Sequence, residues 1–154
     1  MRARPPRRSR RSAQRPAGLR WEPAPDIRAR LVRIAAALEF RHVDLPRLAA
    51  VRTFGSRANA LARIWGLPGI FQFALRQPAW YVVEVIMPDF ARLPRAEQDR
   101  VLIHELLHIP TTFSGGLRPE RSPGFSITSR TVDRLYQLYL ARRRRRCRSR
   151  PPGL

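Results

Sequence analysis

Residues 101–110 (Val-Leu-Ile-His-Glu-Leu-Leu-His-Ile-Pro) predict a helix that carries two histidines on one face. His104 and His108 are four residues apart, and side chains at that spacing lie one above the other on a helix. Two imidazoles so placed supply half of a tetrahedral zinc site. Glu105, next to the first histidine, can act as a base on a metal-bound water. The rest of the chain is therefore expected to build a site around this helix.

Prolines bound this helix, and a strand is predicted before it. Pro94 suits the first position of a helix, whereas Pro110 cannot continue one, so the helix should stop just after His108. Residues 80–87 (Trp-Tyr-Val-Val-Glu-Val-Ile-Met) are mostly aromatic or β-branched and predict the clearest strand. This strand could hold an extended peptide by edge pairing. Glu84 on it is either a rim residue or a site residue, and we favour the rim.

Helical and strand patterns alternate along the remainder of the chain. Asp26 can cap a first helix that runs to about Phe40, and Thr128 or Ser129 opens a last one. Two further strands and a short helical segment are predicted between them, at residues 47–53, 59–67 and 70–76. These elements indicate an α+β fold, with a short mixed sheet packed on the first helix and the histidine helix.

Positive charge is concentrated at the two ends of the chain. The formal net charge is +20, yet residues 21–140 hold sixteen Arg against eleven acidic residues. Residues 1–20 carry eight Arg and residues 141–154 carry seven, with no acidic residue in either segment. We expect both segments to be disordered tails, because they have little apolar surface to bury, and residues 21–140 to form one domain. Such tails could bind nucleic acid by releasing counterions.

Cysteine content and hydropathy favour a cytoplasmic protein without a membrane segment. Cys147 is the only cysteine, which excludes an intramolecular disulfide and fits a reducing compartment. No apolar run approaches the roughly 20 residues of a membrane span. The basic N-terminal segment lacks the apolar stretch of a secretory signal.

A catalytic zinc site needs a third protein ligand and leaves the fourth position to water. No histidine follows His108 and no cysteine lies near, so Glu120 and Asp133 are the downstream candidates. We favour Glu120, because the loop after the Gly115-Gly116 turn could fold it back over the histidine face. Asp133, on the last helix, is the alternative, and a helix that keeps only part of a site is the third possibility.

This ligand set predicts a hydrolytic mechanism. Zinc lowers the pKa of its bound water toward ~7 and polarises the scissile carbonyl. Glu105 would take a proton from the water and pass it to the leaving amine. Tyr136 or Tyr139 could donate to the developing oxyanion, although an aromatic residue on that face of a helix is more typical of a core.

Five stretches match the pattern of a known family: Val-Arg-Thr-Phe-Gly-Ser-Arg at 51–57, Ala-Arg-Ile-Trp-Gly-Leu-Pro at 62–68, Tyr-Val-Val-Glu-Val at 81–85, Ile-His-Glu-Leu-Leu-His-Ile-Pro at 103–110, and Thr-Phe-Ser-Gly-Gly-Leu-Arg-Pro at 112–119. With them, the span from about Asp44 to Leu140 resembles the phage-type metallopeptidases, a small zincin-like family of bacteria, archaea and their viruses. The last two runs are much more specific than the five-residue His-Glu-x-x-His motif alone.

The resemblance implies a small zincin-like domain and zinc-dependent peptidase activity. It implies His104 and His108 as metal ligands and Glu105 as the catalytic residue. Where this chain has Glu120, the relatives usually have a histidine, and a carboxylate is also an accepted zinc ligand. We therefore expect a zinc metallopeptidase that acts on protein or peptide substrates. The alternatives are a basic nucleic-acid-associated protein with an inactive or regulatory zincin core, and a zinc hydrolase of a non-peptide amide.

Overall fold

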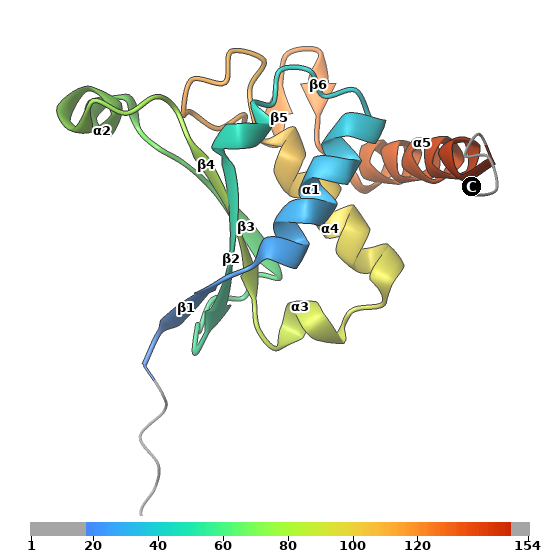
Figure 1. Cartoon of the computed structure of the whole chain (residues 1–154), viewed down its shortest axis with the longest axis horizontal. Helices are drawn as coiled ribbons and strands as arrows, with labels where there is room; N and C mark the ends of the chain where they lie inside the picture. Colours follow the sequence, from blue (N-terminus) through green and yellow to red (C-terminus); the bar gives the residue numbers. More distant parts are fainter. Residues whose placement is uncertain (1–17, 149–154) are drawn as a thin grey trace, which may run out of the picture.

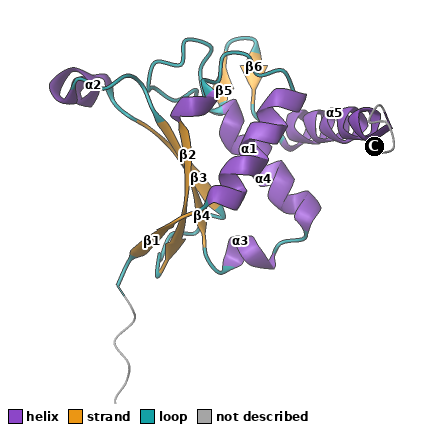
Figure 2. Ribbon diagram, viewed as in Figure 1, coloured by secondary structure: helices purple, strands orange, loops and turns teal. Residues whose placement is uncertain are grey.

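A four-stranded mixed sheet forms one layer of the protein, and helices cover one of its faces (Figures 1 and 2). The computed structural model describes residues 18–148. Within them the sheet order is β1-β2-β4-β3, with β4 parallel to β2 and antiparallel to β3. The strands are β1 (Arg20–Pro23), β2 (Leu48–Phe54), β3 (Ala62–Gly66) and β4 (Tyr81–Ile86). The α+β class is as predicted and is consistent with a small zincin-like domain.

Strand β4 is a central strand of the sheet, and it is apolar on the face that meets the helices. Tyr81, Val83 and Val85 are completely buried there. The strand predicted at 80–87 is confirmed, but its predicted role in edge pairing is wrong, since β2 and β3 occupy both of its sides. The free edge that lies beside the histidine helix belongs to β3 instead.

On the other face of the sheet, Glu84 is held by hydrogen bonds and an ion pair. It is buried rather than at a rim, and its carboxylate accepts hydrogen bonds from Thr53 Oγ1 at 2.6 Å and Trp65 Nε1 at 2.7 Å. Arg63 pairs with it at 3.1 Å. These donors hold the pKa of Glu84 below its usual range against the opposing effect of burial. The carboxylate is thus a structural member of the sheet.

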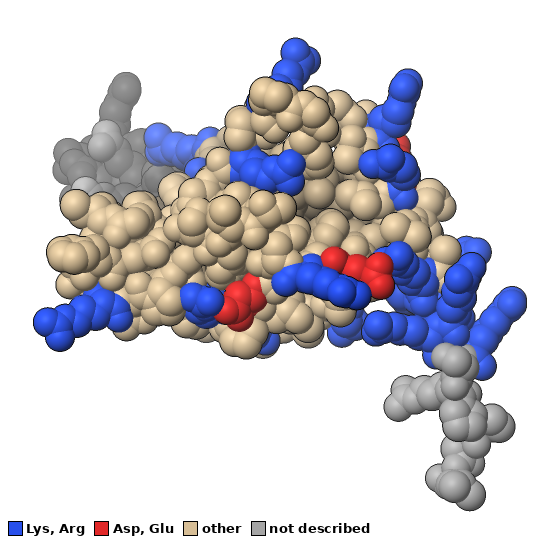
Figure 3. Space-filling model, turned by 90° about the horizontal axis from the view of Figure 1, so that it is seen from above, with Lys and Arg blue, Asp and Glu red and all other residues tan. Residues whose placement is uncertain are grey.

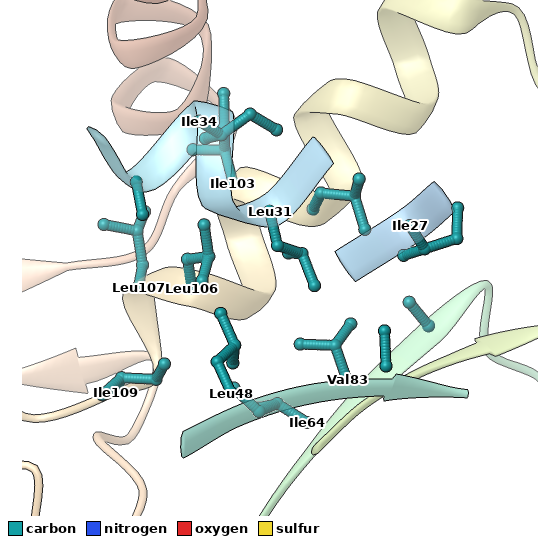
Figure 4. Packing of buried hydrophobic residues seen from close by; sticks show 14 of the residues in the cluster. Ile27, Leu31, Ile34, Leu48, Ile64, Val83, Ile103, Leu106, Leu107 and Ile109 are labelled. Carbon is teal, nitrogen blue, oxygen red and sulfur yellow. The ribbon is translucent and has the colours of Figure 1, made fainter. Parts of the chain in front are cut away.

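Helices α1 (Pro25–Ala37) and α4 (Arg95–Leu107) pack on the sheet, and α5 (Ser129–Arg148) packs on both of these helices. Side chains of α1 and α4 interleave above the strands (Figure 4). Leu31 and Ile34 come from α1 and Ile103 from α4, and all three are completely buried. Because this apolar side of α4 is fixed in the core, its opposite side is left for the histidines.

The first helix differs at both ends from its prediction. Asp26 does not cap it; its carboxylate pairs with Arg52 of β2, which lowers the pKa of Asp26. The helix ends at Ala37, short of Phe40, because Glu39 adopts a left-handed backbone conformation with φ of 57°. Asp26 therefore pairs with a residue of β2 and does not form the predicted helix cap.

A buried ion pair ties α4 to α1. Arg30 Nη2 donates to Asp99 Oδ1 at 2.6 Å, and the two residues are 5% and 2% exposed. Gln98 adds a bond from Arg30 and reaches the carbonyl groups of Phe90 and Leu93 with its own amide. Removal of one partner of such a pair leaves an uncompensated buried charge. These contacts fix the N-terminal half of the histidine helix.

Five short elements complete the structure, and only one of them was predicted. The segment predicted at 70–76 is helix α2 (Gly69–Leu75), which projects beyond the sheet with its apolar side chains exposed (Figure 1). The 3-10 helix at Leu45–Arg47, α3 (Asp89–Arg92) and the hairpin of β5 (Arg121–Ser122) and β6 (Phe125–Ser126) are too short for a hydrophobic period to reveal.

Regular structure extends into both predicted tails. β1 begins at Arg20, and α5 continues through residues 141–148, so these parts of the predicted tails are a strand end and a helix instead of disordered chain. Arginine is a good helix former, and Arg142 anchors this turn by donating to the carbonyl of Ala37 at 2.6 Å. Residues 1–17 and 149–154, the rest of the predicted tails, lie outside the described residues. Among the described helices, none is long and apolar enough to cross a membrane.

Candidate metal centre

The two histidines lie together at the C-terminal end of α4. His104 is in its last turn, and His108 is the residue that caps the helix, just before Pro110. The Nε2 atoms of the two rings are 3.3 Å apart. The predicted helix, its end and the common face of the histidines are confirmed.

A backbone contact fixes the orientation of the His108 ring. Nδ1 of His108 lies 2.7 Å from the carbonyl oxygen of Arg118, and the Arg118 amide donates to the His108 carbonyl at 2.7 Å. Because a carbonyl oxygen only accepts, Nδ1 carries the proton and the lone pair of Nε2 is free. Histidines that bind metals usually donate their second nitrogen in this way. Since the acceptor is backbone, no residue type in the sequence signals this contact.

Glu120 comes from the loop that follows and reaches the histidine pair. Its Oε1 lies 3.7 Å from His104 Nε2, and its carbonyl accepts a hydrogen bond from the Ile127 amide across the hairpin. Asp133, the other candidate, instead accepts a bond from Arg100 at 2.7 Å. The structure thus brings Glu120 and not Asp133 to the histidines.

The loop before Glu120 is held against the end of the sheet by a close backbone approach. Gly115 has a φ of 93°, and a Cβ on it would lie 2.1 Å from the carbonyl oxygen of Leu67. Tyr81 clamps the same turn, accepting from the Gly115 amide at 2.9 Å and donating to the Gly116 carbonyl at 2.6 Å. Glycine is therefore required where the loop turns toward α4.

The three side chains have the chemistry and spacing of a metal site. One ligand atom from each of His104, His108 and Glu120 lies within 4.8 Å of the others. Tetrahedral zinc, with bonds of about 2.0–2.1 Å, would separate its ligand atoms by ~3.3 Å, which the histidine pair already matches. Glu120 is exposed and can close the remaining gap by rotation. Burial and the neighbouring His108 lower the pKa of His104, which favours the neutral ring that a metal needs.

Glu105 occupies a different environment from Glu120. Its side chain is buried, with the residue only 8% exposed, and it reaches the backbone of Ile64 in β3. Burial raises the pKa of Glu105 to about 7, while His108 and a hydrogen bond with the Ile64 backbone oppose the rise. A carboxyl group with a pKa in this range is suited to exchange protons near neutral pH.

A cleft of about 930 Å³ opens on this group of residues. One wall is Ala62 of β3 with residues 59–61 before it, and another is the start of α5 with Val132. Its floor follows one side of α4, from Glu97 to Glu105. Tyr136 and Tyr139 belong to the core and do not line the cleft, so the expectation that one of them reaches an oxyanion is not supported.

Sequence reasoning missed two acidic residues of this cleft, Asp89 and Glu97. They line it together with Arg100 and with Asp133, which the sequence offered only as a metal ligand. Glu97 and Arg100 precede His104 by seven and four residues, a spacing that places them on the same side of the helix. That spacing was visible in the sequence and could have identified them.

Comparison with known proteins gives one match. The model of a family described as "Putative phage metallopeptidase" matches residues 19–136, which include the histidine motif and Glu120. No curated protein and no solved structure shows significant similarity to the chain.

Proposed function

Because the chain belongs to this phage metallopeptidase family, we propose that it is a zinc-dependent peptidase. The observation that carries the proposal is the convergence of His104, His108 and Glu120, with the buried carboxyl of Glu105 beside them. Two nitrogens and one oxygen leave a fourth tetrahedral position open, as in catalytic rather than structural zinc sites.

In this proposal His104, His108 and Glu120 hold zinc, and Arg118 keeps the His108 ring in the correct tautomer through its carbonyl. Zinc, when bound, supplies a water of lowered pKa and polarises the scissile carbonyl. Glu105 takes a proton from the attacking water and delivers it to the leaving nitrogen.

The substrate backbone is proposed to lie along the free edge of β3. Ala62 of this strand lines the cleft, and Ile64 contacts Glu105 through its backbone. A peptide that adds to a sheet edge binds through main-chain hydrogen bonds, which requires little of its side chains. We place the reaction in the cytoplasm, which a single exposed cysteine, Cys147, permits.

Peptide cleavage by the full-length protein tests the proposal. Zinc-loaded protein is incubated with a mixed peptide library, and products are identified by mass spectrometry. We expect cleavage that EDTA abolishes and that added zinc restores. Cleavage that survives complete removal of metal would contradict the proposal, as would an intact library after long incubation with zinc-loaded protein.

A further inference from the structure

The candidate cleft has the opposite charge character from the rest of the chain. The sequence has 31 basic and 11 acidic residues, and most of the charged side chains on the face drawn in Figure 3 are basic. Among the described residues that line the cleft there is one arginine, Arg100, against five carboxylates: Asp89, Glu97, Glu105, Glu120 and Asp133. Nearly half of the acidic residues of the chain therefore line a single cleft.

The single arginine does not offset this charge, because two carboxylates already hold it. Arg100 Nε donates to Asp133 Oδ1 at 2.7 Å, and its Nη1 donates to Glu97 Oε1 at 2.9 Å. Its guanidinium lies 4.3 Å from the centre of the Tyr136 ring. Only a quarter of the Arg100 side chain is exposed, whereas more than half of Glu97 and Asp133 remains open to the cleft. Both carboxylates thus keep free acceptor positions.

Asp89 lines the same cleft and adds a third carboxylate. Its nearest cation is Arg92, at 3.5 Å, and both side chains are well exposed, so this ion pair is weak. Asp89, Glu97 and Asp133 therefore leave a net negative charge even after Arg100 is counted. A cleft lined by one sign of charge concentrates its field and attracts ligands of the other sign.

The distance of these carboxylates from the histidines determines which residue of a bound peptide they would contact. Glu97 precedes His104 by seven residues on the same side of α4, which corresponds to about 10 Å along the helix axis. An extended peptide advances by about 3.3 Å per residue, so that distance spans about three residues. A charge on the metal would be largely screened there, since the Debye length is about 8 Å at physiological salt.

We propose that the cleft selects peptides that carry arginine or lysine about three residues from the scissile bond. Glu97, Asp133 and Asp89 recognise the basic side chain, through charge-assisted hydrogen bonds that a neutral residue cannot make. An acidic residue at the same position is repelled, so the cleft favours basic residues and also rejects acidic ones. This inference rests on the proposed peptidase function and assigns its substrate class.

The test compares peptides that differ at one position. Zinc-loaded full-length protein is given a set of peptides with one cleavage site and Arg, Gln or Glu placed in turn at two to four residues on either side. At one of these positions we expect kcat/KM to be about tenfold or more higher for Arg than for Gln, and lower still for Glu. Raising the salt from about 0.05 M to about 0.5 M should reduce the Arg-to-Glu ratio.

Variants of the cleft give the second part of the test. Glu97→Gln combined with Asp133→Asn leaves Arg100 without its partners, so the preference for Arg over Glu should collapse or reverse. The matched control, Glu39→Gln with Asp44→Asn, removes two carboxylates outside the cleft and should keep the wild-type ratio. Zinc content checks that each variant is folded at the site.

The outcomes separate the two proposals. Cleavage of Arg, Gln and Glu peptides at equal rates by the wild type would overturn the substrate inference and leave the peptidase function standing. A failure to cleave any peptide in the set or in the mixed library would overturn the peptidase function and this inference with it. The salt dependence of the wild-type ratio decides the question even if the double variant does not fold.

Discussion

Glu105→Gln is expected to lower kcat for peptide cleavage by about 10²–10⁴-fold while zinc stays bound. The amide has the same size as the carboxylate and can occupy the same buried position beside β3. It cannot accept the proton of the attacking water, so only the proton transfer is lost. The measurement is kcat with saturating peptide, together with the zinc content of each preparation.

The control for this prediction is Glu22→Gln, the same chemical change on β1. Glu22 pairs with Arg20 on the surface and does not line the cleft. We expect its kcat to equal that of the wild type. If Glu105→Gln cleaves peptides as fast as Glu22→Gln, then Glu105 is not the base.

Glu120→Ala should weaken zinc binding more than the 10–100-fold typical of a lost supporting group, because it removes one of three ligands. Glu120→His should retain zinc, since imidazole is an equally acceptable ligand in the same loop. Competition with a chromophoric chelator measures the zinc affinity of each variant at one pH.

Asp133→Asn is the comparison that decides between the two candidate ligands. Asp133 pairs with Arg100 in the structure, so its replacement should leave zinc affinity close to that of the wild type. Loss of zinc from Asp133→Asn together with normal affinity in Glu120→Ala would reverse the assignment. Normal zinc affinity in both variants would mean that the two histidines bind zinc together with a group other than Glu120 or Asp133.

Local patterns in the sequence were sufficient for the elements that carry the motif. The spacing of His104 and His108 and the prolines at 94 and 110 define α4 without reference to any other part of the chain. The apolar run at 80–87 likewise predicts β4. The turn at Gly115 also pointed correctly to a loop that returns to the histidines with Glu120.

Contacts between distant segments account for what the sequence did not reveal. Strand order depends on pairing between residues far apart, so nothing local indicated that β2 would cover the second side of β4. Asp26 had a local role as a cap but pairs with Arg52 on another strand. The Arg118 carbonyl that orients His108 is backbone, which every residue has. The net charge of the whole chain is strongly positive, so the composition did not indicate a negatively charged cleft.

The metal content of the purified wild-type protein tests the central claim most directly. The arrangement of His104, His108 and Glu120 predicts one zinc per chain that remains after dialysis against metal-free buffer. Elemental analysis beside an accurate protein concentration gives this ratio without any assumption about the substrate. A ratio close to one would support the three-residue site. Protein that is folded, exposed to excess zinc and dialysed, yet holds no stoichiometric metal, would contradict the account.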